Sequence, residues 1–142
     1  MSSLEKHSNT ITKLRLNNYM FMSLSFIVKL TKLEELVLRF NGFYREHLNV
    51  YYRKLEVLQH AIFPHLWKLV FWYGFPNDET LIKFLENNGR NLKHLYIKKL
   101  KCSSSLESVV TTVCPNIELI ITDMPIMGIC KFILFISFRV IH

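Results

Sequence analysis

Glycine and proline are scarce in this chain, with four of each among 142 residues, and cysteine occurs only three times. Half of the residues are hydrophobic, with abundant Leu, Ile, Val and Phe, and together with so few glycines and prolines this excludes a disordered chain. An odd number of cysteines, in a chain long enough to build its own core, excludes a disulfide-bonded miniprotein. The length suits one compact domain.

A secretory signal and a long uninterrupted apolar run are also lacking. The first residues, Met1 to His7, are mostly polar, so we expect an intracellular protein, cytoplasmic or nuclear, with reduced thiols. The one long apolar run, Ile126–Ile141, contains Lys131 and Arg139. A membrane-spanning helix needs about 20 mostly apolar residues, so we do not expect this run to cross a membrane.

One short pattern occurs five times: an apolar residue, two others, an apolar residue, one other and a third apolar residue. The copies begin at Ile11, Leu33, Leu66, Leu92 and Ile117, which gives steps of 22, 33, 26 and 25 residues. Leucine-rich repeats have this signature and periods of about 20–29 residues. A single copy is common in leucine-rich chains, but five in register indicate a repeat. The longest step predicts an insertion near residues 41–52.

Between the copies, the apolar period changes from two residues to about 3.6, the period of a helix. Four segments show such a helical face: Leu24, Ile27 and Val28; Leu55, Leu58 and Ile62; Leu81, Ile82, Phe84 and Leu85; and Leu106, Val109, Val110 and Val113. Each unit is therefore a strand followed by a helix, the crossover that parallel strands need. The sequence predicts an α/β leucine-rich-repeat solenoid, a partial horseshoe with a short parallel sheet on its concave side and helices on its convex side.

The predicted repeat domain, of about five units, covers residues 1–123. Residues 124–142 depart from the repeat pattern and form an atypical apolar tail. For this tail we expect an edge strand or a hairpin that covers the last repeat, because an uncovered apolar edge promotes aggregation.

Three segments resemble a known class of repeat. Residues 114–120 (CPNIELI) resemble the C-P-N-L-x-x-L junction of ribonuclease-inhibitor-like leucine-rich repeats, notably those of F-box proteins, and residues 63–69 (FPHLWKL) resemble it with Phe in the Cys place. Residues 81–96 (LIKFLENNGRNLKHLY) look like repeats of fungal F-box/leucine-rich-repeat proteins. In that family the F-box binds Skp1, which places the protein in a ubiquitin ligase, and the repeats select the substrate.

The chain departs from this family in two ways. We find no F-box in the sequence, and the first residues look like the helix of a preceding unit without its strand. We therefore expect a fragment or a truncated family member. The resemblance implies a Skp1-type adaptor as a partner only if an F-box exists outside this chain.

No residue pattern predicts catalysis, a metal or a cofactor. Cys102, Cys114 and Cys130 form no C-x-x-C pair, which argues against zinc, and we expect Cys114 to be a small buried apolar residue. His60 and His65 have a proline between them and would not share a helix face. The glycines form no phosphate-binding loop, and no Cys–His set suggests a nucleophile. We therefore do not expect an enzyme.

Strand geometry predicts which side chains face away from the core, since side chains alternate along a strand. Each strand has three outward positions, and the first ones are Lys13, Glu35, Lys68, His94 and Leu119. The other two give the useful rows across the sheet: Arg15, Val37, Val70, Tyr96 and Ile121; and Asn17, Arg39, Trp72, Lys98 and Asp123. Trp, Tyr and Arg dominate the energetics of interfaces. The predicted partner-binding residues on the concave face are Arg15, Arg39, Lys68, Trp72, His94, Tyr96 and Lys98. The alternative for Trp72 is that it packs under the insertion or against the next repeat.

The net charge of +7 favours an acidic partner. The alternative is that the basic residues only form a solvated surface. Because repeat solenoids present extended concave surfaces, we expect a protein–protein interaction module. The resemblance implies that this module is the substrate-recognition part of an F-box-type ubiquitin-ligase adaptor. Two alternatives stay open: a basic nucleic-acid-binding surface, and a truncated product without independent function.

Overall fold

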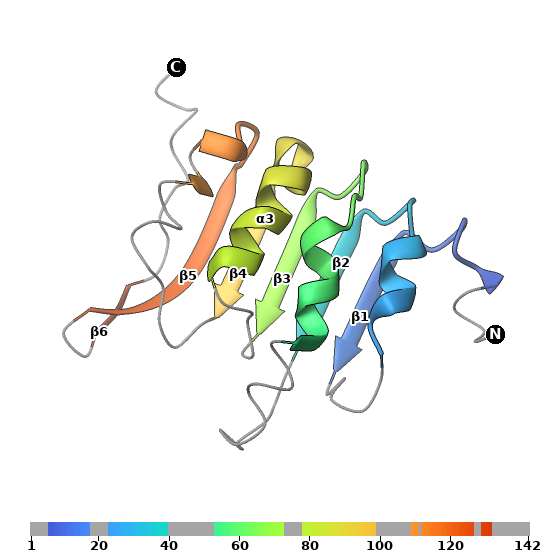
Figure 1. Cartoon of the computed structure of the whole chain (residues 1–142). Coiled ribbons are helices and arrows are strands. Elements are labelled where there is room, and N and C mark those ends of the chain that lie inside the picture. Colours follow the sequence, from blue (N-terminus) through green and yellow to red (C-terminus); the bar gives the residue numbers. More distant parts are fainter. Residues whose placement is uncertain are drawn as a thin grey trace.

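The computed structural model of the chain describes residues 6–17, 23–39, 53–72, 78–98, 109–110, 112–126 and 129–131. In these residues the chain forms a mixed α/β structure, in which the helices lie on one face of a sheet (Figure 1). The strands are β1 (Lys13–Asn17), β2 (Glu35–Arg39), β3 (Lys68–Trp72), β4 (His94–Lys98), β5 (Leu119–Ile126) and β6 (Ile129–Lys131). Strands β1 to β5 are parallel and follow one another in chain order, so the expected mixed α/β class with a short parallel sheet is confirmed.

The strand pairing has the predicted register. Leu14 pairs with Leu36, Leu36 with Leu69, Leu69 with Leu95, and Leu95 with Ile120. The four leucines are at most 8% exposed, so they form one interior row across the sheet. A shift of one residue in any strand would turn its leucines to solvent, which is why the apolar pattern determines the register.

Backbone hydrogen bonds just before the strands repeat in the same way. The carbonyl of Thr12 accepts the N–H groups of Glu34 and Glu35, at 2.7 and 3.0 Å. The carbonyls of Glu34 and Trp67 accept the equivalent pairs of N–H groups from the segments that lead into β3 and β4. Each strand is therefore joined to the next one at its first residue as well as along its length.

The segments between the strands differ from simple α-helices. They contain the 3-10 helices η2 (Ser25–Lys29), η4 (Glu56–His60) and η5 (Gly89–Asn91), and the α-helix α3 (Asp78–Asn88). A 3-10 helix rises about 2.0 Å per residue against 1.5 Å for an α-helix, so it covers a given length with fewer residues. This suits η2, which lies in the shortest of the repeat steps. Residues 109–110 and 112–113 are helical as expected, whereas Leu106 lies outside the described residues.

The core lies between the sheet and these helices. Ile27, Leu30, Leu55, Leu81 and Leu85 are at most 1% exposed and belong to the same cluster as the strand leucines. None of the helices in the described part of the chain is long and apolar enough to cross a membrane.

The expectation for Ile62 is wrong. The pattern places Ile62 on the buried helix face with Leu55 and Leu58, but its side chain is 60% exposed. Helix η4 ends at His60, and Ala61 has extended backbone angles (φ −71°, ψ 143°). The helical period therefore stops before it reaches Ile62.

Beyond residue 123 the chain continues the same strand. Strand β5 extends to Ile126 and then pairs antiparallel with β6, so the expected boundary between residues 123 and 124 falls inside an element. The expected insertion near residues 41–52 and the remainder of the tail, residues 132–142, lie outside the described residues.

A buried asparagine connects the helices to the segment before β3. Asn88, at the end of α3, is 5% exposed. Its Oδ1 accepts the N–H of Phe63 at 2.7 Å, and its Nδ2 donates to the carbonyls of Ala61 and Phe84 at 2.8 and 3.1 Å. These bonds compensate for burying the amide and hold residues 61–63 against the end of α3.

We predict that Leu69→Ala lowers the free energy of unfolding by about 2–5 kcal/mol, because it leaves a cavity in the centre of the leucine row. Val70→Ala is the matched control, since Val70 is the next residue of β3 and lies half-buried on the other face. It should lower the same quantity by less than about 1.5 kcal/mol. Urea unfolding followed by circular dichroism measures the free energy of unfolding of both variants. Equal decreases would contradict the interior position of the leucine row.

We predict that Asn88→Ala destabilises the protein by about 2–3 kcal/mol, because buried backbone groups of Phe63 and Ala61 lose their partners. Asn87→Ala is the control: the Asn87 side chain is exposed and donates one hydrogen bond, to the Gln59 carbonyl at 2.9 Å. Asn87→Ala should lower the free energy of unfolding by less than about 1 kcal/mol. The midpoints of urea unfolding of the two variants decide the comparison.

Candidate partner-binding surface

The outward face of the strands has the alternation that the sequence predicts. In β1 the residues on either side of the buried Leu14 are exposed, and in β2 half-buried residues alternate with the buried Leu36 and Leu38. The residues predicted for the outer face, such as Arg15 and Val37, are therefore accessible, whereas Leu14, Leu36 and Leu38 are buried and Leu16 is half-buried.

The two predicted rows are confirmed by the strand register. Val70 pairs with Val37 on one side and with Tyr96 on the other, and Trp72 pairs with Arg39 and with Lys98. Both rows therefore run across β1 to β5 in the predicted order.

The predicted site residues do not form one cluster. Lys68 pairs with His94, both are half-buried, and Tyr96 lies two residues further along β4. Arg39 is half-buried on β2, while the exposed Arg15 on β1 is three strands from Tyr96, about 14 Å at the usual strand spacing. The backbones of Trp72 and Lys98 are paired, but the side chains of both lie outside the described residues.

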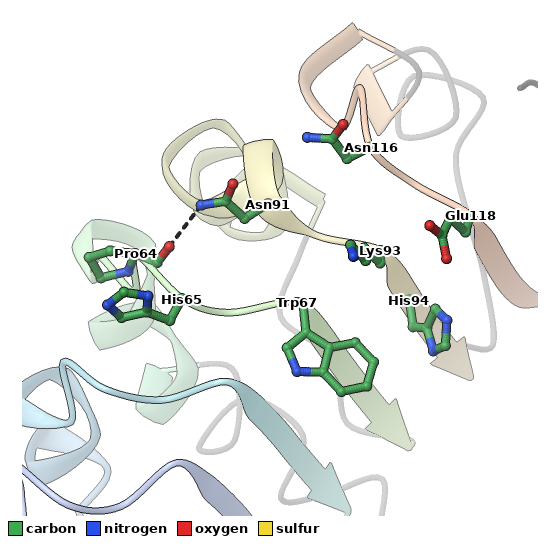
Figure 2. Close-up of a pocket in the computed structure, with 8 residues that line it drawn as sticks. All are labelled: Pro64, His65, Trp67, Asn91, Lys93, His94, Asn116 and Glu118. Atoms are coloured by element: carbon green, nitrogen blue, oxygen red, sulfur yellow. Dashed lines mark hydrogen bonds between the residues drawn. The ribbon is translucent and has the colours of Figure 1, made fainter.

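Beside this strand face lies a hollow that the sequence does not predict. An open pocket of about 590 Å³ is present where the chain enters β3, β4 and β5 (Figure 2). We call this hollow the loop pocket. The residues that line it are Pro64, His65, Trp67, Asn91, Lys93, His94, Asn116 and Glu118. Only His94 belongs to a strand and is also one of the predicted site residues.

The loop pocket is built from equivalent positions of three consecutive units. Lys68, His94 and Leu119 are paired in the sheet, so the residues just before them correspond. These residues are Trp67, Lys93 and Glu118; two positions earlier stand His65, Asn91 and Asn116. A side chain at one place in the repeat therefore lies beside its counterparts, and three loops together make one wall.

Two asparagines connect these loops to one another. Nδ2 of Asn91 donates to the carbonyl of Pro64 at 2.7 Å (Figure 2), and Nδ2 of Asn116 donates to the carbonyl of Arg90 at 2.6 Å. Both asparagines stand just before the first apolar residue of their unit, and both reach back to the preceding loop. The loops are therefore held at a set separation by side chains as well as by the sheet.

Two aromatic rings lie on one side of the pocket. Trp67 is half-buried, and its indole packs edge-on against the ring of His94, with the ring centroids 5.3 Å apart and the planes at 73°. Trp67 is not among the site residues that the sequence predicts, because it belongs neither to the core positions nor to the strand. The available signal is that the other units have Thr12, Glu34, Lys93 and Glu118 at this place, which are all polar.

The charged groups near this surface are mostly accessible. Lys93 and Glu118 are exposed, and Lys13 forms an ion pair of 3.8 Å with Glu35 across β1 and β2. The Lys13 side chain is mostly exposed and that of Glu35 is half-buried, and ion pairs at a protein surface contribute only about 0–1 kcal/mol to stability. Within the described ranges, no three His, Cys, Asp or Glu side chains are grouped so that they could hold a metal.

Cys114 is buried, as expected from the sequence. Its side chain is 1% exposed and lies beside Gly89, where a Cβ atom would come within 2.8 Å of Sγ. Burial raises the pKa of the Cys114 thiol from 9.0 to about 12. Since the thiolate is the reactive form, this environment suits packing and not nucleophilic chemistry.

No protein-family model matches the chain, and neither a curated protein nor a solved structure matches it.

We predict that Cys114 makes the stability of the protein fall above pH 9. Below pH 9 the thiol is protonated in both states, whereas between pH 9 and about 12 only the unfolded state releases the proton. The free energy of unfolding of the wild type, minus that of Cys114→Ala, should therefore decrease by about 1 kcal/mol between pH 8 and pH 10. Urea unfolding at the two pH values measures it, and a constant difference would contradict the raised pKa.

Proposed function

We propose that the chain is a leucine-rich-repeat array that binds a protein partner through the outward face of its strands. The observation that carries this proposal is the single register of five parallel strands, which aligns the outward positions, among them the half-buried Lys68, His94 and Tyr96, in rows beside an open pocket. Rows of this kind suit recognition of an extended surface, as in repeat proteins.

The repeat assignment is supported by bonds that recur at the same place in successive units. Leu66 and Leu92, each the first apolar residue of its unit, bond back to the carbonyls of Phe63 and Gly89, three residues earlier. Ile117 does the same with Cys114. Identical local bonding at intervals of about 25 residues is the geometric signature of a stacked repeat.

Residues 114–120, which resemble the junction of F-box/leucine-rich-repeat proteins, join neighbouring segments in this structure. In this junction Cys114 fills the space beside Gly89, and Asn116 joins its own loop to the preceding one. We therefore propose the substrate-recognition part of an F-box-type ubiquitin-ligase adaptor as the biological setting, without catalytic activity, metal or cofactor in this chain.

Nucleic-acid binding is the second candidate, and the net charge of +7 favours it. A nucleic-acid complex is recognised by its dependence on salt, because counterions are released when basic residues contact phosphates. A steep linear fall of log affinity for nonspecific RNA with log salt would support this candidate. The absence of binding at low salt would remove it.

We predict that Trp72→Ala combined with Tyr96→Ala weakens capture of the partner at least fivefold, the loss of about 1 kcal/mol or more that aromatic anchors typically give. An affinity pull-down from cell extract compares this variant with the wild type. The control is Lys83→Ala combined with Glu86→Ala, on α3, which lies in the layer of helices over the sheet (Figure 1).

The control should capture as much partner as the wild type, and circular dichroism should show that both variants are folded. A protein whose recovery depends on the strand face and not on α3 supports the proposed function. Equal recovery with both variants contradicts it. Recovery of a Skp1-type adaptor would favour the ubiquitin-ligase setting.

A further inference from the structure

We propose that the loop pocket binds a short acidic peptide segment of the partner, and that it holds one aromatic side chain of this segment against Trp67. This inference rests on the proposed function, because it names the kind of segment that a protein partner would contribute. It also extends the binding surface from the strand face to the loops before β3, β4 and β5.

The size and the wall of the pocket suit an aromatic side chain. A volume of about 590 Å³ lies within the range of about 300–1,000 Å³ that is usual for pockets that bind ligands. The half-buried indole of Trp67 provides a flat apolar wall, and the ring of His94 stands at 73° to it (Figure 2). Aromatic rings attract one another in offset and edge-on arrangements, so an aromatic side chain of a ligand can make such contacts with these rings.

The pocket is formed before any partner arrives. The bonds from Asn91 to Pro64 and from Asn116 to Arg90 join the three loops, and Asn88 holds the segment that leads into Pro64. A ligand that enters a preformed pocket needs to order fewer groups, so more of its contact energy remains as affinity. This favours the loop pocket over an isolated exposed aromatic residue as an anchor site.

Lys93 and the net charge of the chain favour an acidic segment. Lys93 occupies the position between Trp67 and Glu118 in the row across the loops and is exposed. A carboxylate next to the bound aromatic residue would contact Lys93, and the net charge of +7 attracts acidic partners at longer range. The carboxylate of Glu118 opposes this ligand. Changes at Lys93 and Glu118 should therefore act in opposite directions.

The experiment measures the fluorescence anisotropy of labelled peptides mixed with the full chain. The probe is a short peptide of one phenylalanine flanked by glutamates. Two matched peptides have alanine in place of the phenylalanine, or lysines in place of the glutamates. The third control probe is an oligouridine of similar negative charge. We expect the first probe to bind best, with an affinity that falls as salt is raised.

Three variants of the protein test the named contacts. Trp67→Ala should lower the affinity for the first probe roughly tenfold or more, as loss of an aromatic anchor does. Lys93→Glu should lower the affinity for the same probe about fivefold. Glu118→Gln should raise this affinity about twofold, because the local charge changes in the opposite sense. Lys83→Glu on α3 is the charge-matched control and should change the affinity less than Lys93→Glu; its ion pair with Glu79, at 3.3 Å, is exposed.

Thermal unfolding shows whether Trp67→Ala is folded, and the exposed Lys93 and Glu118 supply measurements that do not depend on core packing. Equal affinity for all peptides, a preference for the lysine peptide, or binding of oligouridine alone would overturn the inference. So would binding that ignores Trp67 and Lys93. If the pocket fails in this way while partner capture still depends on Trp72 and Tyr96, the proposed function stands without it.

Discussion

The fold depends on the burial of one row of leucines by parallel strands that cannot bury it alone. Each strand is five residues long in β1 to β4 and contributes two inward positions, such as Leu36 and Leu38, which are fully buried. A single unit of this size would leave its apolar side open at both edges. The neighbouring strands and the helices behind them remove that surface from water, so contacts between neighbouring strands contribute to stability.

The same constraint determines where polar groups can be used. With the inward positions occupied by apolar residues, the outward positions of the strands and the segments just before them are accessible. The asparagines illustrate the two uses that remain. Asn88 is buried and satisfies backbone groups inside the structure, whereas Asn91 and Asn116 lie nearer the surface and join successive loops. The loop pocket is a consequence of this repetition, because equivalent loops are stacked side by side.

Most of the strand architecture follows from the local pattern. An apolar residue at every second position, repeated at intervals of 22 to 33 residues, implies the pairing of Leu14, Leu36, Leu69 and Leu95, and the pairing determines which residues share a row. Local periodicity is less informative about where a helix ends. Ile62 continues the helical spacing of Leu55 and Leu58, yet the backbone becomes extended at Ala61 and the side chain is exposed. Asn88 accepts the N–H of Phe63 and donates to the Ala61 carbonyl, a tertiary contact that spacing does not reveal.

The sequence by itself determined the α/β class, the order and register of the parallel strands and the burial of Cys114, because all of these depend on which residues must leave water. Only the tertiary structure decided the form of the connecting helices, the continuation of β5 through residue 123 to Ile126 and the position of the loop pocket. Trp67 shows the reason most clearly. Its neighbours in the chain are ordinary repeat positions, and the partners that make it part of a pocket, His94 and Glu118, come from the next two units. The ring contact with His94 and the shared pocket with Glu118 arise because the sheet places the segments before β3, β4 and β5 next to one another, which local spacing does not encode.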